Sequence, residues 1–311
     1  MIITITLNPC IDRTVMLPAV SLGGINLVEK SRSDIGGKGI NVAVALTQLG
    51  IPATCGGISF NGNRTQLYEG LDKLNIPYDF TAAPGDMRMN IKVVETTKNE
   101  MTEFNSPGEP VSQKILNEFL EKLTVLGSKS DIMVLSGRLP NGAEMDYYKR
   151  CIKALDGYPV KVIVDAEGEA LRQAIEAKPY MIKPNTYELG MVFEREVETV
   201  EDAAMLSQKI IDQGVEIVCC TLGELGAVIV SKNETWYSPA PDIKPKGFQG
   251  AGDSMIAGIC KAVTEGLPTK EMLRYGTAAA AASLIREGTL LCQKTDFERF
   301  LTEPALEPVL I

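Results

Sequence analysis

Short β-branched runs alternate with longer segments of helical periodicity along most of this 311-residue chain. The runs 131–135 and 162–164 are apolar on both faces, which is typical of parallel strands that helices cover on both sides. Similar strand-like runs occur at 2–7, 53–58, 160–164, 180–182, 216–221 and 227–230. Helical patterns occur at 40–49, 64–74, 112–126, 143–155, 167–175, 200–213, 250–265 and 272–286. The alternation predicts an α/β fold: a doubly wound, mainly parallel sheet with helices on both faces.

Two stretches, 12–34 and 87–104, interrupt this alternation. Each has the pattern of short alternating strands and contains no helical pattern of its own. We predict that they form a small β lid on a single α/β domain spanning 1–311. The alternative is a pair of edge hairpins on the main sheet. Lid strands leave an exposed edge unless another strand pairs with it, and a homodimer joined through the lid is one way to cover that edge.

Histidine is absent from the chain. This excludes Ser-His-Asp and Cys-His catalysis and any metal site with a histidine ligand, so proton transfer must fall to a carboxylate, lysine, tyrosine or cysteine. The formal charge of −9 argues against a nucleic-acid partner, which requires a basic surface. The longest run of small apolar residues, 277–285, is too short to span a membrane. Seven cysteines without a C-x-x-C pair are predicted to be free thiols, so we expect a cytoplasmic protein.

The strongest local motif is Gly250-Ala251-Gly252-Asp253-Ser254, which opens a helix pattern. Small residues at a helix start leave backbone N–H groups accessible, and the helix dipole adds positive potential, so the turn is a candidate anion site. Asp253 or Ser254 can be explained as a helix cap alone. The other interpretation is a phosphoryl-transfer site, in which Asp253 takes a proton from a hydroxyl while the amides hold the phosphoryl group. The pentapeptide by itself does not decide between them.

A second glycine-rich motif, Gly36-Gly37-Lys38-Gly39-Ile40-Asn41, precedes another helix pattern. It matches neither the Walker loop nor the dinucleotide fingerprint, so a nicotinamide-dependent dehydrogenase is not supported. Its glycines permit close approach of a ligand, Lys38 offers a positive charge, and Asn41 offers both a donor and an acceptor. A plain loop before a helix would explain the glycines but hardly this combination.

These motifs resemble those of the ribokinase-like (PfkB) sugar kinases, and more closely those of the branch that contains 1-phosphofructokinase and tagatose-6-phosphate kinase. Further matches run nearly from end to end, at 6–12, 136–140, 164–168, 183–188 and 221–226. They are specific for the family and much less specific for the substrate. The resemblance implies the ribokinase fold, ATP as co-substrate and Mg²⁺ as the metal.

The resemblance also assigns roles to individual residues. Asp253 matches the catalytic base, and the anion hole is matched by Gly250, Ala251 and Gly252. The sugar pocket is expected to include Asp12, Gly37, Asn41 and Asn90. The residues beside the nucleotide are expected to be Lys183, Asn185, Thr221, Gly223, Gly226 and Gly252. Asn185 and Glu188 are expected to help hold Mg²⁺ through water; the alternative for Glu188 is an ordinary acid in the first turn of a helix.

A sugar that already carries a phosphate presents a dianion, which arginine binds best. Lys38, Arg88 and Arg138 match the places where loops converge on the sugar pocket of this family. Arg138 replaces the small hydroxyl residue that is usual there, and it is expected to add a phosphate contact. The alternative is that Arg138 is merely an exposed side chain.

The loop before the anion hole departs from the family pattern. Gly247 and Gln249 stand where potassium-activated relatives place acidic or hydroxyl residues, so potassium activation is not expected. Lys244 or Lys246 is a candidate source of the same positive charge. The alternative is that both lysines are solvated and the loop works without a cation.

The expected reaction is the ATP-dependent phosphorylation of a ketohexose phosphate. The first choice that the resemblance implies is fructose 1-phosphate, which would give fructose 1,6-bisphosphate. The alternative within the class is tagatose 6-phosphate, which would give tagatose 1,6-bisphosphate. The alternative from another class is a non-catalytic sugar-phosphate sensor with the same fold.

Overall fold

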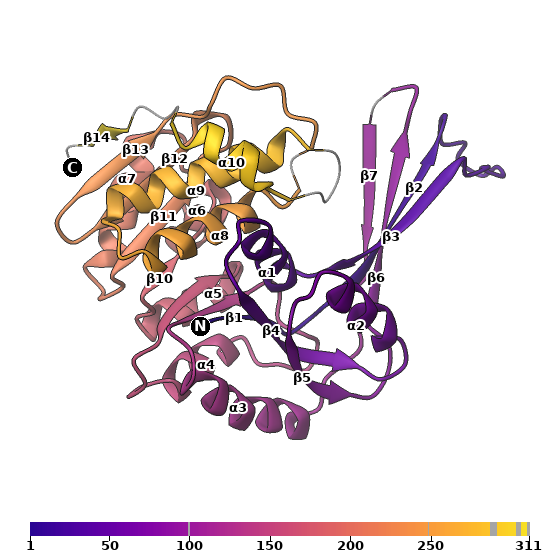
Figure 1. Ribbon diagram of the computed structural model, residues 1–311, viewed down its shortest axis with the longest axis horizontal. Coiled ribbons are helices and arrows are strands. Elements are labelled where there is room, and N and C mark those ends of the chain that lie inside the picture. The colour runs from indigo at the N-terminus through magenta and orange to yellow at the C-terminus, as the bar shows by residue number, and fades with distance from the viewer. Residues whose placement is uncertain (99, 248, 287–290, 303–305, 310–311) are drawn as a thin grey trace.

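The computed structural model describes residues 1–98, 100–247, 249–286, 291–302 and 306–309. Within these ranges the main sheet has ten strands in the order β5-β4-β1-β8-β9-β10-β11-β12-β13-β14 (Figure 1). Neighbouring strands from β5 to β11 are parallel, whereas β12, β13 and β14 are each antiparallel to the strand before. In the same order the strands span Tyr78–Ala83, Ala53–Phe60, Ile2–Thr6, Ile132–Ser136, Lys161–Asp165, Met181–Ile182, Ile217–Thr221, Ala227–Ser231, Thr235–Ser238 and Glu307–Pro308.

Helices pack on both sides of this sheet. One group comprises α1, α8, α9 and α10, each packed against the next, and spans Lys38–Gln48, Ala251–Thr264, Thr269–Leu284 and Lys294–Phe300. The other group comprises α3 to α7, again packed in succession, and spans Gln113–Gly127, Tyr147–Ala154, Gly168–Glu176, Thr186–Phe193 and Val200–Ile211. The strand order runs outward in both directions from β1, so right-handed crossovers place the two groups on opposite faces. The predicted doubly wound α/β fold is confirmed.

Some elements differ from the predicted pattern. The structure adds edge elements that the periodicity did not indicate, namely β5, β13, β14 and α10, as well as the short α6. The helix α4 begins at Tyr147 rather than at 143, because turns occupy the preceding residues. Within those turns the N–H of Ala143 donates to the carbonyl of Pro140 at 3.2 Å, and the N–H of Tyr147 donates to that of Glu144 at 2.9 Å.

The central strands explain where the polar residues gather. Every residue of β1 and β8 is buried, because helices cover both faces of the sheet there. Thr6, Ser136 and Asp165 are the last residues of three neighbouring parallel strands, β1, β8 and β9. Parallel strands end at the same edge of a sheet, so these three residues mark the edge at which ligands of open α/β sheets bind.

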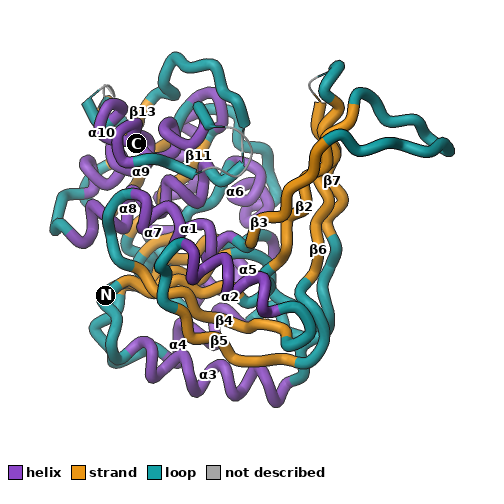
Figure 2. Tube along the Cα trace, turned by 45° about the vertical axis from the view of Figure 1, so that its right-hand side comes forward, coloured by secondary structure: helices purple, strands orange, loops and turns teal. Residues whose placement is uncertain are grey.

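Four strands form a second sheet, which we call the lid, in the order β3-β2-β6-β7. These strands span Lys30–Gly36, Cys10–Leu17, Arg88–Glu95 and Glu100–Asn105. The helix α2 (Arg64–Lys73) packs on β3. Figure 2 shows the lid standing beside the main body. These strands come from the two interruptions of the pattern, and they pair with one another. Along β6 burial alternates, so that Asn90 and Lys92 are buried on one face whereas Met89 and Ile91 are exposed on the other.

In the described ranges of the chain, no helix combines the length and the apolar character needed to cross a membrane. All seven cysteines are buried free thiols. Burial raises the pKa of Cys55 to about 12, and thiols held in this way are protonated and unreactive at neutral pH.

Candidate active site

The turn before α8 lies between two cavities. Gly250 has a positive φ of 75°, a conformation that favours glycine. It lines a cavity of about 350 Å³ that is also bordered by the lid and by the ends of β1 and β8. Ala251 and Gly252 line a second cavity of about 450 Å³. The start of α8, where free N–H groups and the positive end of the helix dipole lie, therefore separates the two cavities.

Asp253 lies in the first turn of α8 and is buried. Asn41, in the first turn of α1, donates a hydrogen bond from Nδ2 to Asp253 Oδ2 at 2.8 Å. Burial, and then repulsion from Asp165, raises the pKa of Asp253 to about 6, although Lys38 opposes this shift. A carboxylate whose pKa lies this close to neutrality is well suited to accept a proton from a substrate.

Asp165, at the end of β9, holds two ammonium groups. Its Oδ1 lies 3.2 Å from Lys38 Nζ and 3.4 Å from Lys183 Nζ. Asp165 and Lys183 are buried, whereas Lys38 is partly exposed. Burial would raise the pKa of Asp165, but the two ammonium groups outweigh it and hold that pKa below its ordinary value. The charge of Asp165 in turn raises the pKa of Lys38, so both groups remain ionised at neutral pH.

Lys38 and Lys183 place positive charge near the start of α8. A β-carbon placed on Gly252 would lie 3.2 Å from Lys183 Nζ, so the ammonium group is directly beside the turn. The sequence predicted both lysines but missed Asp165 as a site residue. A signal was present, because Asp165 is an acidic residue at the carboxyl end of an apolar strand, inside the segment 164–168 that resembles the family.

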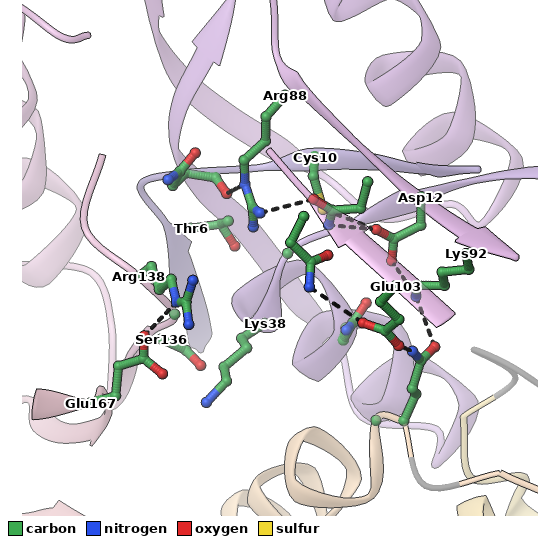
Figure 3. Close-up of a pocket in the computed structure, with 18 of the residues that line it drawn as sticks. Thr6, Cys10, Asp12, Lys38, Arg88, Lys92, Glu103, Ser136, Arg138 and Glu167 are labelled. Atoms are coloured by element: carbon green, nitrogen blue, oxygen red, sulfur yellow. Dashed lines mark hydrogen bonds and ion pairs between the residues drawn. The ribbon is translucent and has the colours of Figure 1, made fainter. Parts of the chain in front are cut away.

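The lid supplies a second polar cluster, drawn in Figure 3. Asp12 accepts hydrogen bonds from Asn90 Nδ2 at 2.8 Å and from Lys92 Nζ at 2.9 Å. Arg88 Nη1 donates to Asn90 Oδ1 at 3.1 Å. The sequence predicted Asp12, Asn90 and Arg88 but missed Lys92. Lys92 follows Asn90 at a spacing of two in an alternating strand, and that spacing places the two side chains on one face.

The predicted sugar-site residues gather around the first cavity. Its lining includes Asp12, Gly37, Lys38, Asn41, Arg88, Asn90 and Arg138. Arg138 also donates a hydrogen bond from Nε to Glu167, and this ion pair is largely exposed to solvent. Such a pair is weak because water screens it, so Arg138 can exchange Glu167 for an anionic ligand at small cost. With Lys38, Arg88 and Lys92, it gives the cavity lining four cations, against the three carboxylates of Asp12, Glu103 and Glu167.

The second cavity has a largely apolar wall. Its lining includes the predicted Thr221, Gly223, Gly226 and Gly252 together with Pro241, Met255, Ala280 and Leu284. Gly226 has a φ of 108°, and a β-carbon there would lie 2.1 Å from the carbonyl oxygen of Ser238, so only glycine fits. Lys183 and Asn185 are not among the described residues that line this cavity. An apolar wall next to a helix start suits a flat ring joined to phosphates.

Asn185 and Glu188 form a capping box at the start of α6. Asn185 Oδ1 accepts from the N–H of Glu188 at 2.8 Å, and Glu188 Oε2 accepts from the N–H of Asn185 at 2.9 Å. Burial, and repulsion from Asp165, raises the pKa of Glu188, so a cation nearby would be favourable. Among the described residues no group of three or more acidic or cysteine side chains is placed to hold a metal directly. The carboxylate of Glu188 and the amide oxygen of Asn185 are ligand types that Mg²⁺ accepts, commonly through water.

Lys244 and Lys246 lie on the surface. The structure gives neither ammonium group an ion pair among the described residues, and Phe248, which precedes Gln249, lies outside those residues. No described contact supports their predicted contribution of charge to the turn. Lys92 does reach this loop, because its Nζ donates to Gln249 Oε1 at 2.7 Å.

Comparison with known proteins agrees with this geometry. The family model described as pfkB family carbohydrate kinase matches residues 5–296. The 1-phosphofructokinase of Bacillus subtilis is 32% identical over 92% of this chain and 93% of its own length, and that of Escherichia coli K12 is 30% identical over 98% and 97%. The solved structure of Escherichia coli phosphofructokinase-2 in complex with potassium gives a TM-score of 0.92 at 30% identity, covering 96% of this chain and 97% of that one. The chain belongs to the pfkB family of carbohydrate kinases.

Its activity class follows from the family. The chain is an ATP-dependent carbohydrate kinase, as the resemblance of its motifs implied. ATP is the co-substrate, and a divalent metal typically accompanies the nucleotide in such kinases.

Proposed function

We propose that this kinase phosphorylates D-fructose 1-phosphate at its 6-hydroxyl to give fructose 1,6-bisphosphate, with Mg·ATP as the donor. The observation that carries the proposal is the position of the Gly250 turn between a polar cavity rich in cationic side chains and a largely apolar one. A sugar phosphate suits the first cavity and a nucleotide suits the second. The relatives named as 1-phosphofructokinases, which match nearly the full chain, support fructose 1-phosphate as the sugar.

The polar cavity has complementary groups for both parts of such a substrate. Asp12 and Asn90 are placed to bind sugar hydroxyls, since one is an acceptor and the other both a donor and an acceptor. Lys38, Arg88 and Arg138 supply positive charge for the phosphate that the sugar already carries.

In the transfer, Asp253 takes the proton of the attacking hydroxyl. That oxygen forms a bond to the γ-phosphorus while the bond from the same phosphorus to the β–γ bridging oxygen breaks, and ADP leaves. The N–H groups of the Gly250–Gly252 turn and the ammonium group of Lys183 offset negative charge on the moving phosphoryl group. Bound Mg²⁺ supplies further charge neutralisation at the nucleotide phosphates, and Asn185 and Glu188 are the residues that would hold it through water.

A substrate panel tests the proposal. Fructose 1-phosphate, fructose 6-phosphate and tagatose 6-phosphate are compared in an assay of ADP formation, with potassium or sodium as the monovalent cation. We expect kcat/KM for fructose 1-phosphate to exceed the others by about tenfold or more, with no dependence on potassium. A preference for tagatose 6-phosphate would instead identify the alternative kinase, and binding of sugar phosphates without turnover would identify a sensor.

The raised pKa of Asp253 predicts how the reaction depends on pH. A base acts only when it is deprotonated, so we expect kcat/KM to fall as the pH drops through about 6. An aspartate with its ordinary pKa would cause this loss only near about pH 4. The Asn41→Ala variant loses a hydrogen bond that favours the carboxylate form, so its inflection should lie at higher pH than that of the wild type. Rates measured between about pH 5 and pH 8 test both expectations, and a wild-type profile that is flat over that range would contradict the assignment of Asp253.

We further propose that two copies of the chain associate through their lids. Ile91 and Phe104 are opposite one another on β6 and β7, and both are exposed, as is Met89 on the same face. In the part of the chain that the structure describes, β3 and β7 are the edge strands of the lid, and the loop from β2 to β3 exposes Leu22 and Ile25 almost completely. Exposed apolar side chains beside the edge strands of a sheet are typical of an interface.

The dimer is tested by mutation of that face. We expect the wild type to sediment as a dimer and Ile91→Glu to shift it to a monomer, because a buried unpaired carboxylate opposes association. Met145 is also exposed but lies outside the lid, so Met145→Glu is the matched control and should leave the dimer intact. A monomeric wild type at micromolar concentration would reject the proposal.

The cysteines support a reducing compartment, and we propose the cytoplasm. All seven are free and buried, and none forms a disulfide. Proteins of oxidising compartments commonly rely on disulfides, whereas cytoplasmic proteins keep their thiols reduced.

A further inference from the structure

Lys92 connects the lid to the segment that immediately precedes α8. Its side chain is only 7% exposed, and Nζ donates both to Asp12 Oδ2 at 2.9 Å and to Gln249 Oε1 at 2.7 Å. Gln249 Nε2 donates in turn to Glu103 on β7. Figure 3 shows Asp12, Lys92 and Glu103 gathered at one end of the cavity. A single glutamine side chain therefore bonds to two lid strands.

Gln249 lies next to the anion site, so its contact with Lys92 can affect that site. Gln249 is followed directly by Gly250, the first residue of the turn that we assign to the migrating phosphoryl group. Asp12, at the other end of the contact, lines the cavity assigned to the sugar. Lys92 thus joins a sugar-binding carboxylate to the loop that positions the anion site.

The chemistry of Lys92 makes the connection stiff. An ammonium group has three donors and no acceptor, and here two of them are directed to Asp12 and Gln249. Because the side chain is buried, losing either partner would leave a desolvated donor without a replacement from water. A shift of Asp12 when a sugar hydroxyl binds would therefore act on Gln249 through this buried ammonium group.

We propose that Lys92 and Gln249 form a latch through which occupation of the sugar cavity orders the Gly250 turn, so that sugar phosphate and ATP bind cooperatively. Lys92 is a positioning residue in this latch, because it acts through Asp12 and Gln249. The inference rests on the proposed function only in that the two cavities hold these two ligands. By reciprocity, ATP tightens the binding of the sugar phosphate by the same factor.

The decisive variant is Gln249→Leu. It removes the hydrogen-bonding groups of the side chain next to the turn while leaving the pair of Asp12 and Lys92 intact. Gln66→Leu, at an exposed position of α2, is the matched control. Lys92→Met is less clean, because it also leaves the buried Asp12 without its cation and should weaken sugar binding itself.

The test measures the affinity of a non-hydrolysable ATP analogue with and without the sugar phosphate that supports turnover in the substrate panel. In the wild type and in Gln66→Leu we expect the sugar phosphate to tighten analogue binding by about fivefold or more. In Gln249→Leu the ratio should approach one, while the affinity for the analogue alone stays within about twofold of the wild type. Equal ratios in Gln249→Leu and the wild type, or a ratio of one in the wild type, would overturn the latch.

A second measurement separates the latch from the proposed function. Hydrogen exchange of the ligand-free protein is followed in peptides covering 88–95 and 249–255. Loss of the latch should speed exchange in both peptides of Gln249→Leu and in neither peptide of Gln66→Leu. Exchange that is unchanged in Gln249→Leu would reject the latch without bearing on the substrate. Absence of turnover with every sugar phosphate would reject the proposed function without bearing on the exchange result.

Discussion

Replacement of Asp253 by asparagine is expected to lower kcat by about 10³-fold, within the range that removal of a general base produces. Asparagine has nearly the same shape as aspartate, so the packing at the start of α8 should survive. It cannot accept the proton of the attacking hydroxyl, however, and the remaining groups around the turn supply only positioning and charge. ADP formation at saturating fructose 1-phosphate and ATP measures the loss.

The same experiment distinguishes loss of a base from general damage. Affinity for a non-hydrolysable ATP analogue should stay within about twofold of the wild type, because Asp253 takes part in proton transfer rather than nucleotide binding. Asp156→Asn, an equivalent change at an exposed position, should leave kcat unchanged. Removal of a general base usually lowers the rate by at least about 10²-fold. If Asp253→Asn retained about a tenth or more of the wild-type kcat, another group would therefore have to serve as the base.

Asp165→Asn is expected to destabilise the fold and to reduce activity together. The buried carboxylate neutralises Lys183, which is itself buried, and Lys38 as well. Removing one partner of a buried ion pair leaves an uncompensated charge, which costs about 3 kcal/mol or more of the free energy of unfolding. The two ammonium groups would then repel each other beside the turn, so kcat should also fall.

Urea unfolding of the ligand-free protein measures this stability change. Adding Lys183→Met to Asp165→Asn should recover part of the loss, because the unpaired buried charge is then gone. Asp131→Asn, which removes an exposed carboxylate paired with the N-terminus, is the control and should have little effect. Wild-type stability in Asp165→Asn would show that the two lysines do not depend on this carboxylate.

The pH dependence of stability has a defined sign at this position. Folding lowers the pKa of Asp165, so its contribution is fully present above the ordinary aspartate pKa of about 4. It is lost as the pH falls below that value, because the unfolded chain then binds the proton more readily than the folded one. The Asp165→Asn variant should lack this part of the acid-induced loss.

Most of the sequence-based predictions that agree with the structure rest on features of short segments of the chain. Period and apolar content indicated the buried strands β1 and β8, because helix cover on both faces demands continuous apolar runs. The glycines at 250 and 252 indicated the start of α8, because a helix terminus open to a ligand needs small residues. By contrast, the edge strand β5 depends on its pairing with β4, and the periodicity did not reveal it. Nor did the periodicity show the turns over 140–147 that precede α4.

The sequence by itself determined the class of fold and the family, and it predicted the base and three of the four cations that line the sugar cavity, because each of these lies in a short motif. Only the tertiary structure decided which charges meet. Asp165 lies 127 residues from Lys38, and Lys92 lies 157 residues from Gln249. Electrostatic and hydrogen-bond energies depend on distance in space and on burial, and neither follows from local pattern. The sequence predicted Lys183 at this site but missed Lys92, whose contact with Gln249 exists only in the folded chain, and no described contact brings Lys244 or Lys246 to the turn.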